Sequence, residues 1–188
     1  AQIAPSATLA IDTRAKALKA EGRDVVGFGA GEPDFDTPEY VRAAAQRAID
    51  EGRTRYTPVP GTLSLRKVIA EKFIKDNGLA YDVSQIIVSS GAKLSIFTAL
   101  SVLVDDGDEV LIPSPYWVSY PEMVKMVGGV PVFVPCHHED GFIVRPEEIA
   151  RRVTDKTKAL ILNSPSNPNG SVLPRATLEK IAELAVQK

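Results

Sequence analysis

The stretch that decides the predicted fold is "IIVSSGAKLSIFTALSVLVDDGDEVLIPSPYW", residues 86–117. Residues 86–88 and 110–112 are short apolar runs of the kind found in buried strands. Residues 91–104, between them, are mostly apolar over the length of a helix. Strands that are apolar on both faces and alternate with helices indicate a parallel or mixed sheet that helices cover on both sides. We therefore predict an α/β fold.

The same alternation continues on both sides of this stretch. Apolar spacing and capping residues predict further helices at residues 8–21, 38–51, 65–77, 117–127, 146–153 and 177–186. Apolar runs between turns predict further strands at residues 25–28, 130–134 and 159–162. Ligands of such sheets bind at the carboxyl ends of the strands, so we expect the functional residues in the turns that follow them.

The composition excludes several classes of protein. The chain has 188 residues, 44% of them hydrophobic and 24% charged, which is ordinary for a soluble globular protein. A net charge of −2 argues against a nucleic-acid partner, and no apolar run reaches the roughly 20 residues that span a bilayer. The single cysteine, Cys136, cannot form an internal disulfide, and residues 1–22 lack the apolar core of a signal peptide. We expect a cytoplasmic protein.

Two patterns resemble known sites only in part. Residues 27–31, Gly-Phe-Gly-Ala-Gly, approximate a dinucleotide-binding loop, but the third glycine comes one position early and no helix follows to face a pyrophosphate. A turn that allows close backbone packing remains open for Gly27 and Gly29. Residues 136–140 contain Cys, two His, Glu and Asp, but adjacent His side chains point in different directions. We therefore predict neither a dinucleotide site nor a metal site.

Two turns at strand ends could bind a ligand. Residues 89–93, Ser-Ser-Gly-Ala-Lys, lead into a helix whose first N–H groups would suit an anion, although a plain capped helix fits equally well. Trp117, just past the next strand, could stack on an aromatic ligand or fill the core. The Ser114–Pro115 bond before it is a candidate cis peptide.

A third turn, "NSPSNPNG" at residues 163–170, follows the apolar run 159–162. An Asn side chain donates and accepts hydrogen bonds at once, and a neighbouring proline limits its freedom. The same residue types are also the normal composition of loops. Two Ser/Asn-Pro turns after neighbouring strands favour a binding site over an ordinary loop.

Together these stretches resemble the class I aminotransferases, which are pyridoxal-phosphate (PLP) enzymes of fold type I, the aspartate aminotransferase fold. The bacterial subgroup that acts on aspartate and related amino acids is the most similar. The matching motifs are spread over essentially the whole chain. They are "PSATLAI" (5–11), "GAGEPDFDTP" (29–38), "RYTPVPG" (55–61), "SSGAK" (89–93), "DDGDEVLIPSPYWVSYPEM" (105–123) and "NSPSNPNG" (163–170).

The resemblance implies a three-layer α/β/α sandwich with a mixed, mostly parallel sheet. Residues 1–27 would belong to the small domain, and residues 28–188 would form the N-terminal part of the large, PLP-binding domain, here truncated. The activity implied is transamination between an amino acid, aspartate or a related one, and a 2-oxo acid, with PLP as cofactor. The enzyme would be a homodimer with a shared active site.

The resemblance also implies roles for individual residues. The residues expected to bind the cofactor are Tyr56, Gly91, Ala92, Lys93, Trp117 and Asn167. The amides of the glycine, alanine and lysine would hold the phosphate, Trp117 would stack on the pyridine ring, and Asn167 would bond its phenolic oxygen. Tyr56 would contact the phosphate of the neighbouring subunit. Gly31, Trp117 and Asn167 would contact the substrate. Two residues depart from the family pattern: Leu94 replaces Gln, and Asn169 replaces Thr.

The catalytic residues of the family are expected beyond residue 188. These are the Schiff-base lysine, the carboxylate on the pyridinium nitrogen and the arginine that binds the substrate carboxylate. We therefore expect the N-terminal half of an enzyme, inactive alone, with no catalytic residue assigned here. A polypeptide this short should aggregate or need a partner chain. A non-catalytic module of the same fold, or another PLP reaction such as that of a lyase or racemase, is the alternative.

Overall fold

The computed structural model describes residue 3 and residues 7–29 and 31–187, and the chain divides into two compact units. The first unit comprises Ala1–Ala30 and Phe97–Lys188, and the second comprises Gly31–Ile96. Within the described residues, no helix combines the length and the apolar character that crossing a membrane requires.

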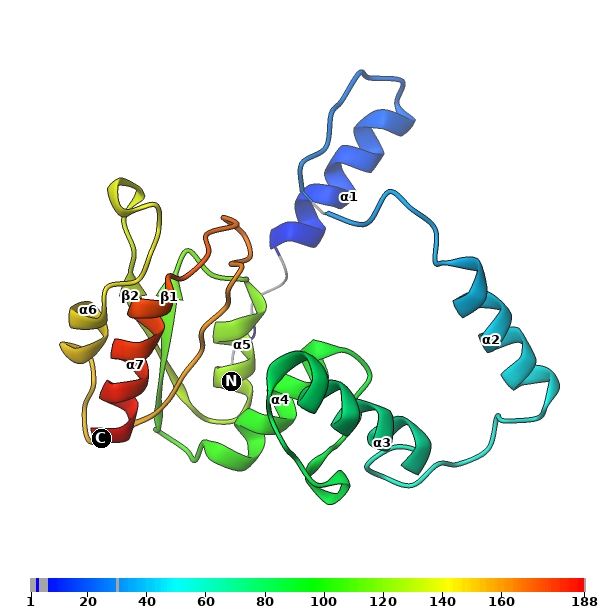
Figure 1. Cartoon of the computed structure of the whole chain (residues 1–188). Coiled ribbons are helices and arrows are strands. Elements are labelled where there is room, and N and C mark those ends of the chain that lie inside the picture. The colour runs from blue at the N-terminus through cyan, green and yellow to red at the C-terminus, as the bar shows by residue number, and fades with distance from the viewer. Residues whose placement is uncertain (1–2, 4–6, 30, 188) are drawn as a thin grey trace. The chain divides into compact units, whose positions relative to one another are not determined.

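A parallel sheet forms the centre of the first unit (Figure 1). Its strands are β1 (Glu109–Ser114), β2 (Val130–Pro135) and β3 (Thr157–Leu160), in the order β2-β1-β3. The middle strand pairs in parallel with both neighbours, so that Val110 lies opposite Pro131 on one side and Ala159 on the other. Because all three strands run in one direction, their carboxyl ends lie along the same edge of the sheet.

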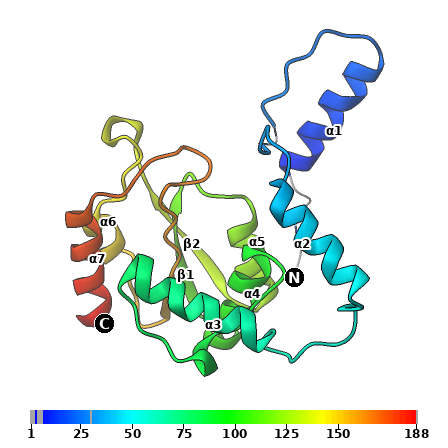
Figure 2. The same cartoon turned by 45° about the vertical axis from the view of Figure 1, so that its right-hand side comes forward.

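Helices cover this sheet on both faces (Figures 1 and 2). α6 (Pro146–Ala150) and α7 (Arg175–Gln187) lie on one face, and α5 (Ser119–Met126) lies on the other. The predicted three-layer α/β fold is therefore confirmed. The pairings of the described strands are all parallel, and no antiparallel member of the expected mixed sheet occurs among them.

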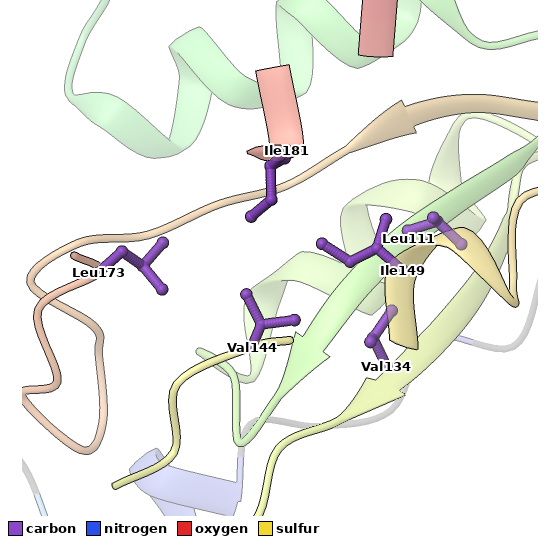
Figure 3. Close-up of a cluster of buried hydrophobic side chains, with 6 residues drawn as sticks. All are labelled: Leu111, Val134, Val144, Ile149, Leu173 and Ile181. Atoms are coloured by element: carbon purple, nitrogen blue, oxygen red, sulfur yellow. The ribbon is translucent and has the colours of Figure 1, made fainter. Parts of the chain in front are cut away.

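The core of the first unit lies between the sheet and the α6/α7 layer (Figure 3). Its buried side chains point toward one another from strands, helices and loops; they are Leu111, Val134, Val144, Ile149, Leu173 and Ile181. Val110 and Ile112, which alternate with Leu111 along β1, are also buried, at 0% and 1% exposure. The middle strand is thus apolar on both faces because both faces are covered.

Short turns connect α5 to the sheet. Gly128 and Gly129 follow this helix, and a Cβ atom added to Gly129 would lie only 2.7 Å from Val104 Cγ1 and 3.0 Å from Val124 Cγ1. Any larger residue there would have to displace two buried valines, so Gly129 permits the close approach of helix and turn.

Helices make up the regular structure of the second unit. α2 spans Glu39–Asp50, and α3 spans Leu63–Lys72 and continues as a π-helical turn, Phe73–Asn77. Gly78 ends that turn in the left-handed conformation (φ 67°), as the Asn-Gly pair predicts. A 3₁₀ turn at Val83–Gln85 follows, capped by Asp82.

Three other elements lie outside the central sheet. α4 (Ala92–Leu103) begins in the second unit and ends in the first. α1 (Ala7–Ala20) and a 3₁₀ turn at His138–Asp140 belong to the first unit. The predictions for α1 and α4 differ from their bounds by one residue at each end.

Two predicted strands are wrong. Residues 25–28 and 86–88 form no helix or strand and take no part in the described sheet. An apolar run becomes a strand only when a second backbone pairs with it, and Val88 N–H, which donates to Pro60 O at 3.0 Å, makes one isolated bond rather than a ladder.

Two further elements differ in their bounds. β3 lies two residues before the predicted 159–162, and α6 ends three residues before the predicted 153. Val153, Ile161 and Leu162 continue the apolar pattern past the ends of these two elements, where periodicity alone does not mark the boundary.

Candidate functional site at the strand ends

The turns after β1 and β3 line one pocket at the carboxyl edge of the sheet. Ile161 N–H donates to Leu111 O at 3.0 Å, which keeps the chain beside β1 just past the end of β3. The pocket has a volume of about 30 Å³, and its lining includes Tyr116, Asn163 and Asn167. That space is enough for about one water molecule and too small for an aromatic ring.

Side chains of the 163–170 turn hold its own backbone. Asn163 Oδ1 accepts the backbone N–H of Asn167 at 2.7 Å, and Asn169 Oδ1 accepts that of Ser171 at 2.9 Å. Ser164 Oγ accepts the N–H of Leu173, also at 2.9 Å. Asn163 and Asn169 therefore stabilise the turn, as Asx residues do.

Asn167 differs from the other two Asn residues of the turn. It is exposed, and its side-chain amide makes no hydrogen bond to any residue that the structure describes. The bond to Asn163 involves only its backbone N–H. The side chain that the sequence singles out is thus the one whose donor and acceptor are both available to a ligand.

Trp117 is half-buried beside the same edge. It follows Ser114–Pro115, whose peptide bond is cis as predicted. Its indole meets the ring of Tyr120 edge-on, with centroids 5.4 Å apart. Tyr120, buried at 7% exposure, lines the pocket that includes Asn167. The structure therefore places Trp117 next to the pocket wall and Asn167 on its lining.

Aromatic stacking and a thiol complete the surroundings of this pocket. The ring of Tyr116 stacks on that of Phe133, with centroids 4.9 Å apart and planes at 10°. Cys136 is half-buried, and burial raises the pKa of its thiol. The thiol donates to Val134 O at 3.7 Å. A protonated, half-buried thiol is a packing group rather than a nucleophile.

The residues expected to hold a phosphate lie in the second unit. Gly91 adopts a positive φ of 86°, which a residue with a Cβ rarely adopts, and an added Cβ would meet no atom of the described residues within 4 Å. Its N–H donates to Ser89 O at 2.8 Å, so one of the three expected amide donors is engaged in a turn. Ser95 N–H donates to Gly91 O at 3.3 Å, and Ala92 and Lys93 precede that first bond of the helix.

Gly31 and Tyr56, the remaining expected site residues, also lie in the second unit. Both are exposed, Tyr56 over its whole side chain. A Cβ added to Gly31 would meet no described atom within 4 Å. Their positions allow contact with a ligand or a partner, but their roles stay predictions.

The glycine-rich stretch 27–31 has a packing role in its middle. A Cβ on Gly29 would lie 3.1 Å from Ile11 Cγ2 of α1, which is tighter than ordinary contact. This favours the interpretation that the glycine allows close approach of chain and helix. In the 136–140 stretch, His138 pairs with its neighbour Glu139, and Asp140 pairs with Arg145. No group of side chains suited to a metal ion occurs among the described residues.

The residues that stabilise the site are not among those that the sequence predicts. Asn163, Ser164 and Asn169 hold the turn, and Tyr120 supports Trp117. The spacing of Asn169 and Ser171, two residues apart, is a recognisable Asx signal. The bonds from Asn163 and Ser164 span four and nine residues, and no local pattern indicates them.

Comparison with known proteins gives the same assignment. The model of the family "Aminotransferase class I and II" matches residues 23–188. The chain belongs to this family. It is 51% identical to a probable aspartate/prephenate aminotransferase of Aquifex aeolicus over 98% of this chain and 47% of that protein. It is 50% identical to the aspartate aminotransferase of Geobacillus stearothermophilus over 99% of this chain and 47% of that protein.

Solved structures of the family have the same fold as this aminotransferase-family chain. The aspartate aminotransferase of Thermus thermophilus with maleate superimposes with a TM-score of 0.95 at 49% identity. The alignment covers 98% of this chain and 48% of that one. The chain therefore spans about half the length of the relatives it matches.

Proposed function

We propose that this chain forms part of a PLP-dependent transaminase that moves an amino group between an amino acid, aspartate or a related one, and a 2-oxo acid. The observation that supports this most is local: the turn after β3 uses Asn163 and Asn169 internally and leaves the amide of Asn167 without a described partner at the strand ends. The relatives at about 50% identity carry the names of aspartate or aspartate/prephenate aminotransferases.

The residues present suit PLP. The exposed amide of Asn167 can donate to the phenolic oxygen of the PLP ring and accept a hydrogen bond from a substrate. The half-buried indole of Trp117 can stack on the same ring. At the start of α4, the positive φ of Gly91 and the open space around it leave room for a phosphate. The amides of Gly91, Ala92 and Lys93 would hold that phosphate, and the N–H of Gly91 donates to Ser89 O in this structure.

PLP, when bound, supplies the electron sink that lets a bond to the substrate α-carbon break. The residues of this chain bind and orient. Asn167 would fix the phenolic edge of the ring, Trp117 would cover one face and exclude water from it, and Gly31 would lie against the substrate carboxylate. The groups that move protons are assigned to none of these 188 residues.

Two finer features belong to the same proposal. Residues 1–27 would form part of a small domain and residues 28–188 part of the large one. Tyr56, whose side chain is fully exposed, would contact the phosphate bound by a second copy, which requires a homodimer. A dimer with complementary sites is a common arrangement for a closed, symmetric assembly.

The test uses the full chain, by which we mean the complete enzyme of which we propose these 188 residues to be part, with added PLP. It measures the transfer of ¹⁵N from labelled amino acids to a panel of 2-oxo acids by mass spectrometry. We expect ¹⁵N in the product amino acid, with aspartate among the best donors. Release of CO₂, of an eliminated group or of the mirror-image amino acid without nitrogen transfer would instead indicate another PLP reaction. Failure of the full chain to bind PLP would leave only a non-catalytic module.

A further inference from the structure

Asn163 lies at the point where the sheet passes into the 163–170 turn. It comes after residues 161–162, which follow β3 and begin with the Ile161 N–H bond to β1. Asn163 is half-buried and lines the pocket. Its side-chain oxygen accepts the backbone N–H of Asn167 at 2.7 Å, within the normal range for a good hydrogen bond. The bond joins residues four positions apart, so it links the middle of the turn to the turn's first residue.

The other end of the turn is also anchored. Leu173 is part of the buried cluster, and its N–H donates to Ser164 Oγ at 2.9 Å. Gly170 N–H donates to Ser166 O at 2.7 Å, and Ser166 N–H donates to Ser171 O at 2.9 Å. Both ends of the turn are therefore held, and the bond from Asn163 is the one that fixes the backbone of Asn167 itself.

The side-chain amides of Asn163 and Asn167 differ in their hydrogen bonding. The side-chain oxygen of Asn163 accepts a hydrogen bond within the turn, whereas the side chain of Asn167 has no partner among the described residues. A side chain binds a ligand more tightly when its own backbone is already fixed, since the protein then loses less conformational freedom on binding. Losing the acceptor at residue 163 would let the backbone of Asn167 sample other conformations.

We propose that Asn163 is a positioning residue for Asn167: its side-chain oxygen holds the backbone of Asn167 so that the amide of Asn167 meets the cofactor in one orientation. This inference rests on the proposed function, since it takes Asn167 as a PLP ligand. Asn163 makes this bond in the PLP-free protein too, so its loss weakens PLP binding only through the lost preorganisation of Asn167. That loss is worth at most the roughly 1 kcal/mol of a neutral hydrogen bond, which is about fivefold in the dissociation constant.

The test compares four forms of the full chain: parent, Asn163→Ala, Asn163→Asp and Asn169→Ala. Asn163→Asp keeps an acceptor in the same place. Asn169→Ala is the matched control, because it removes the same kind of bond from the same turn but leaves the N–H of Asn167 paired. The readouts are the dissociation constant of PLP by equilibrium dialysis and hydrogen exchange of residues 163–171 in the PLP-free protein.

We expect Asn163→Ala to bind PLP more than twofold and up to about fivefold more weakly, and to exchange faster at the amide of Asn167. Asn163→Asp should restore slow exchange, and Asn169→Ala should change PLP binding twofold or less. Parental affinity in Asn163→Ala, or equal losses in Asn163→Ala and Asn169→Ala, would overturn the positioning role while the proposed function stands. A parent chain that binds no PLP would overturn the proposed function, and this inference with it.

Discussion

The ring of Tyr120 packs edge-on against the indole of Trp117, with centroids 5.4 Å apart and planes at 84°. The backbone N–H of Tyr120 also donates to the carbonyl of Trp117 at 3.0 Å, so Tyr120 contacts both the backbone and the indole of Trp117. Tyr120 is buried, and burial raises the pKa of its hydroxyl. The ring rather than a charged oxygen is therefore the group that supports Trp117.

Substitutions at Tyr120 should separate the ring from the hydroxyl. Tyr120→Phe keeps the edge-on contact, so the ¹⁹F resonance of fluorotryptophan at Trp117 should stay near its parental position. Tyr120→Leu removes the edge-on contact and should shift that resonance. It should also lower the free energy of unfolding by about 0.5–1.5 kcal/mol beyond the loss of buried apolar area. Trp117→Phe assigns the signal. An unchanged resonance in Tyr120→Leu would mean that the ring does not hold the indole.

The buried cluster can be tested with a matched pair of valines. Val144 is 2% exposed in the cluster, whereas Val172 is 61% exposed in the same unit. Val144→Ala should lower the free energy of unfolding by about 2 kcal/mol, because it removes buried methyl groups and leaves a cavity. Val172→Ala should change it by about 0.5 kcal/mol or less. Urea denaturation of both variants measures the difference, and equal effects would contradict the assigned core.

A methyl group at Gly129 should be poorly tolerated. The added Cβ would lie 2.7 Å from Val104 and 3.0 Å from Val124, both buried, so one of these valines or the backbone must move. We expect Gly129→Ala to lower the free energy of unfolding by about 1–3 kcal/mol.

Gly27→Ala is the control for Gly129→Ala. There the nearest atom, Ala15 Cβ, would be 3.9 Å from the new methyl group, which is ordinary contact. Calorimetric melting of both variants compares them. A melting temperature of Gly129→Ala equal to that of Gly27→Ala would show that the turn is looser than the structure describes.

The thiol of Cys136 should react slowly and only at raised pH. Burial, and to a smaller extent the charge of Asp140, raise its pKa, whereas a backbone bond involving Ser114 lowers it. The protonated thiol therefore persists where an exposed cysteine ionises. Alkylation by iodoacetamide, followed by mass spectrometry against pH, should rise at higher pH for the folded protein than for a denatured sample.

The same shift has a consequence for stability. The thiol pKa is higher in the folded than in the unfolded chain, so the unfolded chain loses its proton first as the pH rises. The contribution of Cys136 to stability should therefore decline above the ordinary thiol range and be unchanged below it. Cys136→Ala should lack this decline, and the same decline in that variant would assign it to other groups.

Much of the architecture can be predicted from residues 86–117 and their surroundings. The spacing of apolar residues is a local property, so it predicts the helices α1, α4 and α7 and the strands β1 and β2 to within one or two residues. The same pattern cannot predict that the apolar runs 25–28 and 86–88 form no strand, because a strand exists only when a second backbone pairs with it.

The site shows the same division. The residue types at strand ends, and the resemblance of their motifs to one family, are enough to indicate Asn167 and Trp117. Which of three Asn side chains in the turn is left for a ligand cannot be predicted in this way, because it depends on hydrogen bonds of Asn163 and Ser164 to residues four and nine positions away.

The sequence by itself determined the α/β class, most of the helices, the strands β1 and β2, and the turns in which we propose a ligand site, since these follow from local spacing and residue chemistry. The tertiary structure alone decided that β1 is the middle strand and that the runs 25–28 and 86–88 join no strand of the described sheet. It also decided that Asn163 holds the backbone of Asn167, while the side-chain amide of Asn167 bonds no described residue. The physical reason is that a hydrogen bond between distant positions forms only once packing has brought them together, and no spacing along the chain records that.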